Sequence, residues 1–177
     1  MLWNNPTARI SLSAIALIGA GTLASAQVLS PGSDTFAEVG AEGPWKIYAD
    51  AQRQSCLIEG MDANGNVVQM GLTADHSLGY VGVFTQAPVE LAQSAEITIE
   101  VNGNAYSGTA QMREHGLADG YTGGYFVANN PDFVQDMRAG TTMIAFANAT
   151  GEGVAVDLAG SAAAIDAAAA CTAQLGA

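Results

Sequence analysis

Carboxylates are the side chains best able to do chemistry in this sequence, because the other reactive types are scarce. The chain has 17 Asp and Glu residues but only two histidines and two cysteines. Glu96, Glu100, Glu114 and Asp119 lie in one part of the chain, and two carboxylates about 5–10 Å apart can divide the work of hydrolysis between them. These residues define one hypothesis, a small hydrolase that uses paired carboxylates.

A calcium-loop pattern is present only in its first half. Asp62, Asn64 and Asn66 have the spacing of the first three ligands, but Val67 stands where the loop requires glycine and Thr73 where it requires glutamate. Asn-Gly between two β-prone runs is instead a strong hairpin signal. We therefore predict a hairpin turn here and no bound metal.

The remaining reactive residues lack the spacing that their chemistry needs. Asp75-His76-Ser77 contains the three residue types of a hydrolytic triad, but neighbours in sequence do not converge on one reacting atom. Glu114-His115 and Asp119 lack the paired-histidine spacings of zinc sites. Ser161 lies between a predicted strand and a predicted helix, but alanine occupies both glycine positions of the nucleophile-elbow pattern, so we predict a helix N-cap. We predict no catalytic residue, no metal and no cofactor.

Residues 1–26 have the three parts of a secretory signal peptide. Arg9 precedes an apolar run at residues 14–23, and Ala24-Ser25-Ala26 forms a small-x-small cleavage site. No apolar run reaches the roughly 20 residues that a spanning helix needs. We therefore expect a periplasmic or secreted protein without a membrane span, beginning near Gln27.

The charge of the chain narrows the choice of partners. The formal net charge is −12, so nucleic acid and anionic membrane surfaces are poor partners. The length that remains after signal cleavage fits one domain. We predict an N-terminal arm at residues 27–43 and a single β-rich domain at residues 44–177.

Cys56 and Cys171 are the only cysteines, and in an exported chain we expect them to form a disulfide. The bridge would close a loop over most of the mature chain, which is worth about 4–5 kcal/mol as loop-closure entropy. Cys171 shares one stripe of a predicted C-terminal helix, residues 162–175, with Ala164, Ala168 and Leu175. Small residues on that stripe would let the helix lie close to a sheet.

Alternating apolar and polar residues predict a mainly β protein. Strands are expected at residues 45–50, 55–61, 67–72, 78–85, 97–101, 106–112, 141–147 and 153–158. Asn102-Gly103 should form a second hairpin turn, and Asn130-Pro131 should start a short helix. The resulting fold class is an antiparallel sandwich or partly open barrel with a short helix and a C-terminal helix. Glu96 and Glu100 alternate with isoleucines and should face solvent.

The glycine-rich segment at residues 120–128 is predicted to be an edge strand or a loop packed by aromatic rings. It contains Tyr121, Tyr125 and Phe126. Aromatic side chains at a surface often anchor partner proteins. These three residues are therefore our candidates for binding a partner.

The layout of several segments resembles that of known exported proteins. It combines Trp45, Cys56, a Phe133-Val134 helix ending near Gly140, and the residues 156–163 followed by Cys171. It is similar to small exported proteins of alphaproteobacteria, and more distantly to the invasion-associated locus B family. The resemblance implies an exported β-rich domain without an assigned reaction. Our first functional hypothesis is thus a non-catalytic domain that binds a protein or envelope component, and the carboxylate hydrolase is the alternative.

Overall fold

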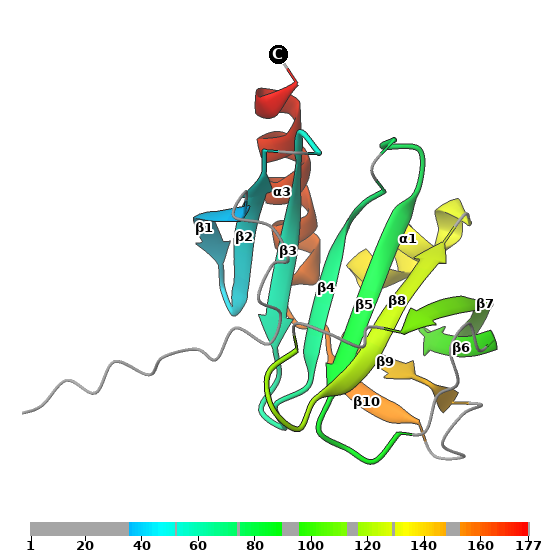
Figure 1. Ribbon diagram of the computed structural model, residues 1–177. Helices are drawn as coiled ribbons and strands as arrows, with labels where there is room; N and C mark the ends of the chain where they lie inside the picture. Colours follow the sequence, from blue (N-terminus) through cyan, green and yellow to red (C-terminus); the bar gives the residue numbers. More distant parts are fainter. Residues whose placement is uncertain are drawn as a thin grey trace, which may run out of the picture.

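The computed structural model describes residues 36–51, 53–73, 75–89, 96–112, 117–128, 130–147 and 153–176. Within them ten strands form one sheet in the order β1-β2-β3-β4-β5-β8-β7-β6-β9-β10, and two helices pack on it (Figure 1). The strands are β1 (Phe36–Glu42), β2 (Trp45–Asp50), β3 (Ser55–Met61), β4 (Val67–Leu72), β5 (Gly79–Thr85), β6 (Glu96–Val101), β7 (Asn104–Met112), β8 (Thr122–Ala128), β9 (Thr142–Ala145) and β10 (Val154–Asp157). The helices are α1 (Pro131–Ala139) and α3 (Ser161–Leu175).

Each pair of neighbouring strands is antiparallel, as predicted. The sheet bends so that β6, β7, β9 and β10 run across the direction of β2 to β5 (Figure 1). It does not close, because the outer strands β1 and β10 have no hydrogen-bonded pairing with each other among the described residues. The mainly β fold class predicted from the sequence is confirmed. No helix within these ranges is long and apolar enough to cross a membrane.

The predicted hairpin turns are present. Val101 pairs with Asn104 across Asn102-Gly103, and both turn residues have positive φ, 53° and 79°, which is the geometry of a tight two-residue hairpin. In the turn between β3 and β4, the Asp62 carboxylate accepts hydrogen bonds from the backbone N–H groups of Asn64 and Asn66. Those oxygens therefore stabilise the turn.

Two strands differ from the sequence-based expectation. β1 lies within the predicted N-terminal arm and pairs with β2; most of its residues are exposed, so no apolar alternation marks it. β8 is an interior strand between β5 and β7. A Cβ atom on Gly123 would lie 2.1 Å from the carbonyl oxygen of Val83, and one on Gly124 would lie 2.5 Å from that of Gln111. The glycines therefore allow both neighbouring strands to approach.

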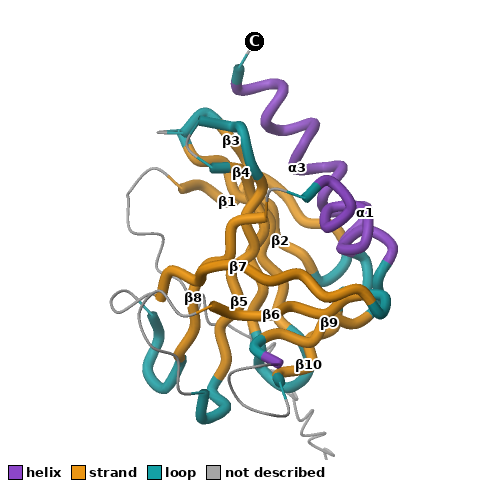
Figure 2. Tube along the Cα trace, turned by 90° about the vertical axis from the view of Figure 1, so that its right-hand side faces the viewer, coloured by secondary structure: helices purple, strands orange, loops and turns teal. Residues whose placement is uncertain are grey.

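Both helices cover the same face of the sheet (Figure 2). The predicted stripe of α3 faces the core, with Ala164 0 % and Ala168 8 % exposed. The predicted Cys56–Cys171 disulfide is present and joins β3 to α3, with the two Cα atoms 5.9 Å apart. Next to it, the backbone N–H of Cys56 donates to Thr172 Oγ1 at 2.8 Å. The C-terminal helix is thus held to the sheet by a covalent and a hydrogen bond.

Ser161 is not the N-cap of α3, which corrects the prediction. Gly160 occupies the cap position in the left-handed conformation, with φ 81°, and Ser161 is the first helical residue. Its side chain is buried and donates from Oγ to the carbonyl oxygen of Met137 at 2.8 Å. The hydroxyl therefore joins the start of α3 to α1. The N-cap predicted for α1, Asn130, is confirmed, since its side chain accepts from the N–H of Asp132.

Candidate functional site

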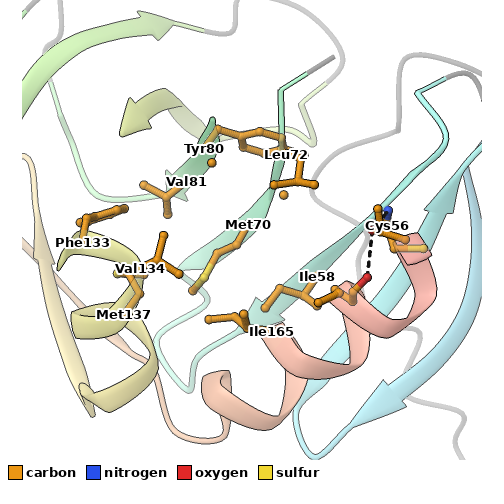
Figure 3. A pocket seen from close by; sticks show the side chains of 15 residues that line it. Cys56, Ile58, Met70, Leu72, Tyr80, Val81, Phe133, Val134, Met137 and Ile165 are labelled. Atoms are coloured by element: carbon orange, nitrogen blue, oxygen red, sulfur yellow. Dashed lines mark hydrogen bonds between the residues drawn. The ribbon is translucent and has the colours of Figure 1, made fainter. Parts of the chain in front are cut away.

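An apolar pocket lies between α1 and α3, over the inner face of β3, β4 and β5 (Figure 3). Its floor includes Ile58, Met70 and Val81 from the three strands. α1 supplies one wall and α3 the other, from the residues Phe133, Val134, Met137, Ile165, Ala168, Ala169 and Thr172. The apolar core is thus open to the surface at this pocket.

Among the described residues, the polar contacts between the two helices lie near one end of the space that they enclose. The Ser161 hydroxyl bonds the Met137 carbonyl there, and Arg138 forms an ion pair with Asp166 at 2.7 Å. The pocket-lining residues Val134 and Ala169 lie beyond this junction, and both are exposed. Small side chains on α3 leave the space between the walls unfilled.

The pocket volume of about 160 Å³ decides what could enter it. Apolar cavities of roughly 150 Å³ hold one benzene molecule, whereas sites for drug-sized ligands and cofactors usually measure about 300–1,000 Å³. One aromatic ring or branched aliphatic side chain would therefore fit. A molecule the size of a nucleotide would extend out of the pocket.

The lining offers little to orient a polar ligand. Among the 15 lining residues, only Tyr80 and Thr172 have a polar side-chain group that is not part of the disulfide. Thr172 Oγ1 accepts from the N–H of Cys56 and donates to the carbonyl of Ala168. The Tyr80 ring packs over Gly71 and edge-on against Tyr125. Selectivity in this pocket therefore has to come from shape and apolar contact.

The structure describes three of the four sequence-predicted carboxylates. Glu96 and Glu100 are exposed on β6, on the face opposite the buried isoleucines, as predicted. Asp119 is also exposed. Glu114 and His115 lie outside the described residues, so the pairing of Glu100 with Glu114 stays a prediction. No group of three potential metal ligands occurs in the described ranges.

Asp75-His76-Ser77 forms part of the loop between β4 and β5. The Asp75 carboxylate accepts from the Thr73 hydroxyl at 2.6 Å and from the Ser77 backbone at 3.1 Å, and these bonds lower the pKa of Asp75 to about 2. His76 Nε2 lies 2.6 Å from the carbonyl oxygen of Arg53. The carboxylate and the imidazole thus contact different groups and do not form a triad.

The three aromatic candidates for partner binding occupy two different faces. Phe126 is 3 % exposed and belongs to the main core, so its ring is not available at the surface. Tyr121 and Tyr125 pack on the opposite side of the sheet, where their hydroxyls donate to the carbonyl of Gly65 and to Gln69 Oε1. None of the three lines the apolar pocket, although Phe126 packs against Phe133 and Tyr125 against Tyr80.

Glu59 is a buried carboxylate that the sequence analysis did not select. It is 8 % exposed, and Gln69 Nε2 donates to its Oε2 at 2.6 Å. Burial raises the pKa of Glu59, while the Gln69 bond and the charge of Lys46 act against that rise. The feature of the sequence that could have indicated its burial is its position among the strand-forming residues of β3. Perturbed carboxylates gather at functional sites, but this one has a satisfied hydrogen bond across the sheet.

Replacing Glu59 with glutamine is expected to change how stability depends on pH. Because its pKa is raised in the folded protein, the folded state binds this proton more tightly than the unfolded chain does. The contribution of Glu59 to stability is therefore greatest below its ordinary value near 4.5 and is lost as pH rises through the folded pKa. In urea unfolding from about pH 4 to pH 8, the wild type should lose stability relative to Glu59→Gln. If the difference in unfolding free energy between the two proteins stays constant with pH, the pKa of Glu59 is not raised in the folded protein.

Comparison with known proteins assigns this chain to no family. No protein-family model and no curated protein matches the sequence. Among solved structures, the crystal structure of invasion associated protein B from Bartonella henselae has a TM-score of 0.49 at 17 % sequence identity. The match covers 76 % of this chain and 96 % of that one. The origin and export of the chain stay predictions.

Proposed function

We propose that this chain is an exported, non-catalytic domain that binds a partner protein by taking one apolar side chain into the pocket between α1 and α3. The observation that supports this most is the size of the pocket, about 160 Å³, together with its apolar lining. Protein interfaces commonly depend on a few aromatic or aliphatic side chains that fill such pockets. A partner side chain also needs no polar groups in the pocket, because its own backbone can bond at the rim.

The surface around the pocket is suited to such an interface. Val134 on α1 lines the pocket and is 43 % exposed. Leu72 at the end of β4 lines the pocket and is partly exposed. Apolar side chains around a pocket add contact area when a partner docks. The binding site favoured here thus differs from the aromatic segment at residues 120–128.

The Cys56–Cys171 disulfide supports the proposed location outside the cytoplasm. Disulfides persist in oxidising compartments and are rare where thiols are kept reduced. The signal-peptide pattern, whose residues lie outside the described ranges, agrees with it. The partner would then be an envelope or extracellular protein.

Filling the pocket is expected to abolish partner capture. Ala169 and Ala170 are both exposed on α3, but only Ala169 lines the pocket. Ala169→Phe would place a ring where the partner's side chain enters, while Ala170→Phe adds the same ring beside it. The tagged mature domain should capture the same cross-linked envelope protein whether it is the wild type or Ala170→Phe. Capture by Ala169→Phe should fall at least about tenfold, which corresponds to 1.4 kcal/mol.

Equal capture by the two phenylalanine variants would contradict the proposal, since only one of them fills the pocket. Far-ultraviolet circular dichroism and thermal unfolding of both variants provide the folding control. A hydrolytic activity that is lost in Glu114→Gln and retained in Ala169→Phe would favour the carboxylate hydrolase instead.

A further inference from the structure

We infer that the hydrogen bond from Ser161 to Met137 sets the width of the pocket, and that the partner's anchor is therefore a side chain the size of leucine or phenylalanine and not tryptophan. This inference rests on the proposed function, because it specifies the anchor that the same pocket takes. Ser161 is not among the lining residues. It is a positioning residue that acts through Met137, which is one of them.

The bond between Ser161 and Met137 joins the two walls of the pocket directly. Ser161 is the first residue of α3 and is 1 % exposed, and its Oγ donates to the carbonyl oxygen of Met137 at 2.8 Å. Met137 lies in the last turn of α1, where carbonyl groups have no partner within the helix. The bond thus satisfies such a carbonyl and holds Met137 on the wall opposite Ile165 of α3 (Figure 3).

The start of α3 is fixed to the sheet, so it gives α1 a firm attachment. Trp45 on β2 is 2 % exposed, and its Nε1 donates to the carbonyl oxygen of Ala159 at 2.8 Å. The backbone N–H of Leu158 donates to the carbonyl oxygen of Thr141 at 2.9 Å. These bonds hold the residues just before Ser161. The Ser161 hydroxyl therefore places α1 relative to a fixed point.

Contacts on the other flank of α1 give the direction in which its wall would move. Asp136 and Arg138 are about 200° apart around the helix. The Asp136 carboxylate accepts hydrogen bonds from Asn104 Nδ2 at 2.8 Å and from the Tyr106 hydroxyl, both on β7, whereas Arg138 pairs with Asp166 on α3. α1 is thus held between β7 and α3. Weakening its attachment to α3 leaves the bonds to β7, which would widen the pocket.

The Ser161 bond is the stronger of the polar contacts described between α1 and α3. The side chains of Arg138 and Asp166 are 37 % and 65 % exposed, and exposed ion pairs contribute little because water and salt screen them. Met137 is 2 % exposed, so loss of the Ser161 hydroxyl would leave a buried carbonyl without a partner, which is more costly. The position of the α1 wall therefore depends mainly on Ser161.

The width of the pocket decides which apolar anchors it encloses. Its volume of about 160 Å³ is close to that of the roughly 150 Å³ cavities that hold one benzene molecule. A leucine side chain or a phenylalanine ring fits such a space. The two fused rings of tryptophan require the walls to move apart. Discrimination between phenylalanine and tryptophan therefore reports the spacing of the walls, whereas both side chains are large and apolar.

Three uncharged amino-acid derivatives test this discrimination. Protein labelled with ¹³C-methyl methionine would be titrated with the N-acetyl amides of leucine, phenylalanine and tryptophan, and each affinity read from the Met70 signal, since Met70 lines the pocket. The wild type should bind the tryptophan derivative about tenfold more weakly than the phenylalanine derivative. In Ser161→Ala this ratio should fall to about twofold or less, because the α1 wall yields. Ser161→Thr keeps the hydroxyl and should restore the wild-type ratio.

Two further variants control for folding and for the loss of a hydroxyl. Ser107→Ala removes an exposed hydroxyl on β7, away from the lining residues, and should leave the ratio unchanged. Asp166→Asn alters an exposed side chain of α3 and should lower the ratio in the same direction as Ser161→Ala, by less. If circular dichroism shows that Ser161→Ala does not fold, Asp166→Asn decides, and a wild-type ratio in that variant overturns the inference.

The remaining outcomes separate this inference from the proposed function. If Ser161→Ala lowers the affinity for all three derivatives equally, or leaves the ratio at its wild-type value, Ser161 only supports the fold and the inference is wrong. If the wild type binds the tryptophan and phenylalanine derivatives equally, and Ala169→Phe blocks both, the inference is wrong and the proposed function stands. If no derivative gives a saturable shift of Met70, or if Ala169→Phe binds all three as the wild type does, the proposed function is wrong as well.

Discussion

Replacing Cys171 with serine is expected to lower the free energy of unfolding by about 4 kcal/mol. The Cys56–Cys171 bridge joins residues 115 positions apart, so its loss frees a long loop in the unfolded chain. The loss also removes the covalent link between β3 and α3, which holds one wall of the pocket. Urea unfolding of the mature protein without reductant, followed by circular dichroism, measures the change.

Two comparisons identify the disulfide as the cause. Ala170→Ser introduces a hydroxyl at an exposed position of the same helix and should change stability by less than about 0.5 kcal/mol. Wild-type protein unfolded in the presence of a strong reductant should be about as unstable as Cys171→Ser. If Cys171→Ser has the stability of the oxidised wild type, the bridge contributes nothing to folding.

Phe126→Ala is expected to lower the free energy of unfolding by about 3–5 kcal/mol. The ring is 3 % exposed, lies 5.7 Å from that of Phe133, centroid to centroid, and packs over Gly108. Truncation would leave a cavity between β7, β8 and α1. Thermal and urea unfolding measure the loss.

The neighbouring residue supplies the control. Val127 is 37 % exposed and points to the other side of β8, so Val127→Ala should cost less than about 1 kcal/mol. If Phe126→Ala is as stable as the wild type but binds its partner more weakly, the ring acts at a surface, as the sequence analysis had suggested. The burial of Phe126 predicts the reverse.

Local signals predicted much of the fold. The Asn102-Gly103 turn and the alternation around it are readable from a few neighbouring residues, because a two-residue turn and the strand period depend on local backbone geometry. Asn130-Pro131 marked the start of α1 for the same reason. The pairing of Cys56 with Cys171 followed from their number, since two cysteines allow one intramolecular disulfide.

Features that depend on distant parts of the chain were missed. β8 reads as a glycine-rich edge or loop, but Gly123 and Gly124 are needed because β5 and β7 approach from both sides. Ser161 has the sequence context of a cap, yet its hydroxyl bonds Met137, 24 positions away. The burial of Glu59 depends on its place in the sheet.

The pocket itself could not be predicted from the sequence. Its residues come from three strands and two helices, and most of them are of types that are ordinary at core positions. Among the described residues, the polar contacts of α1 with α3 lie near one end of the pocket and are made by Ser161 and the Arg138–Asp166 ion pair. No short sequence pattern predicts that arrangement.

Methionine methyl groups give the most direct test of whether the pocket receives an apolar side chain. Met70 and Met137 line the pocket, whereas Met61 and Met143 do not. Protein labelled with ¹³C-methyl methionine would be titrated with N-acetylphenylalaninamide, an uncharged mimic of one anchor residue, and the signals assigned by Met→Leu substitutions. The account predicts saturable shifts of Met70 and Met137, unchanged Met61 and Met143, and no shifts in Ala169→Phe. Absence of a saturable shift at Met70 and Met137, or shifts of equal size at Met61, Met70, Met137 and Met143, would contradict it.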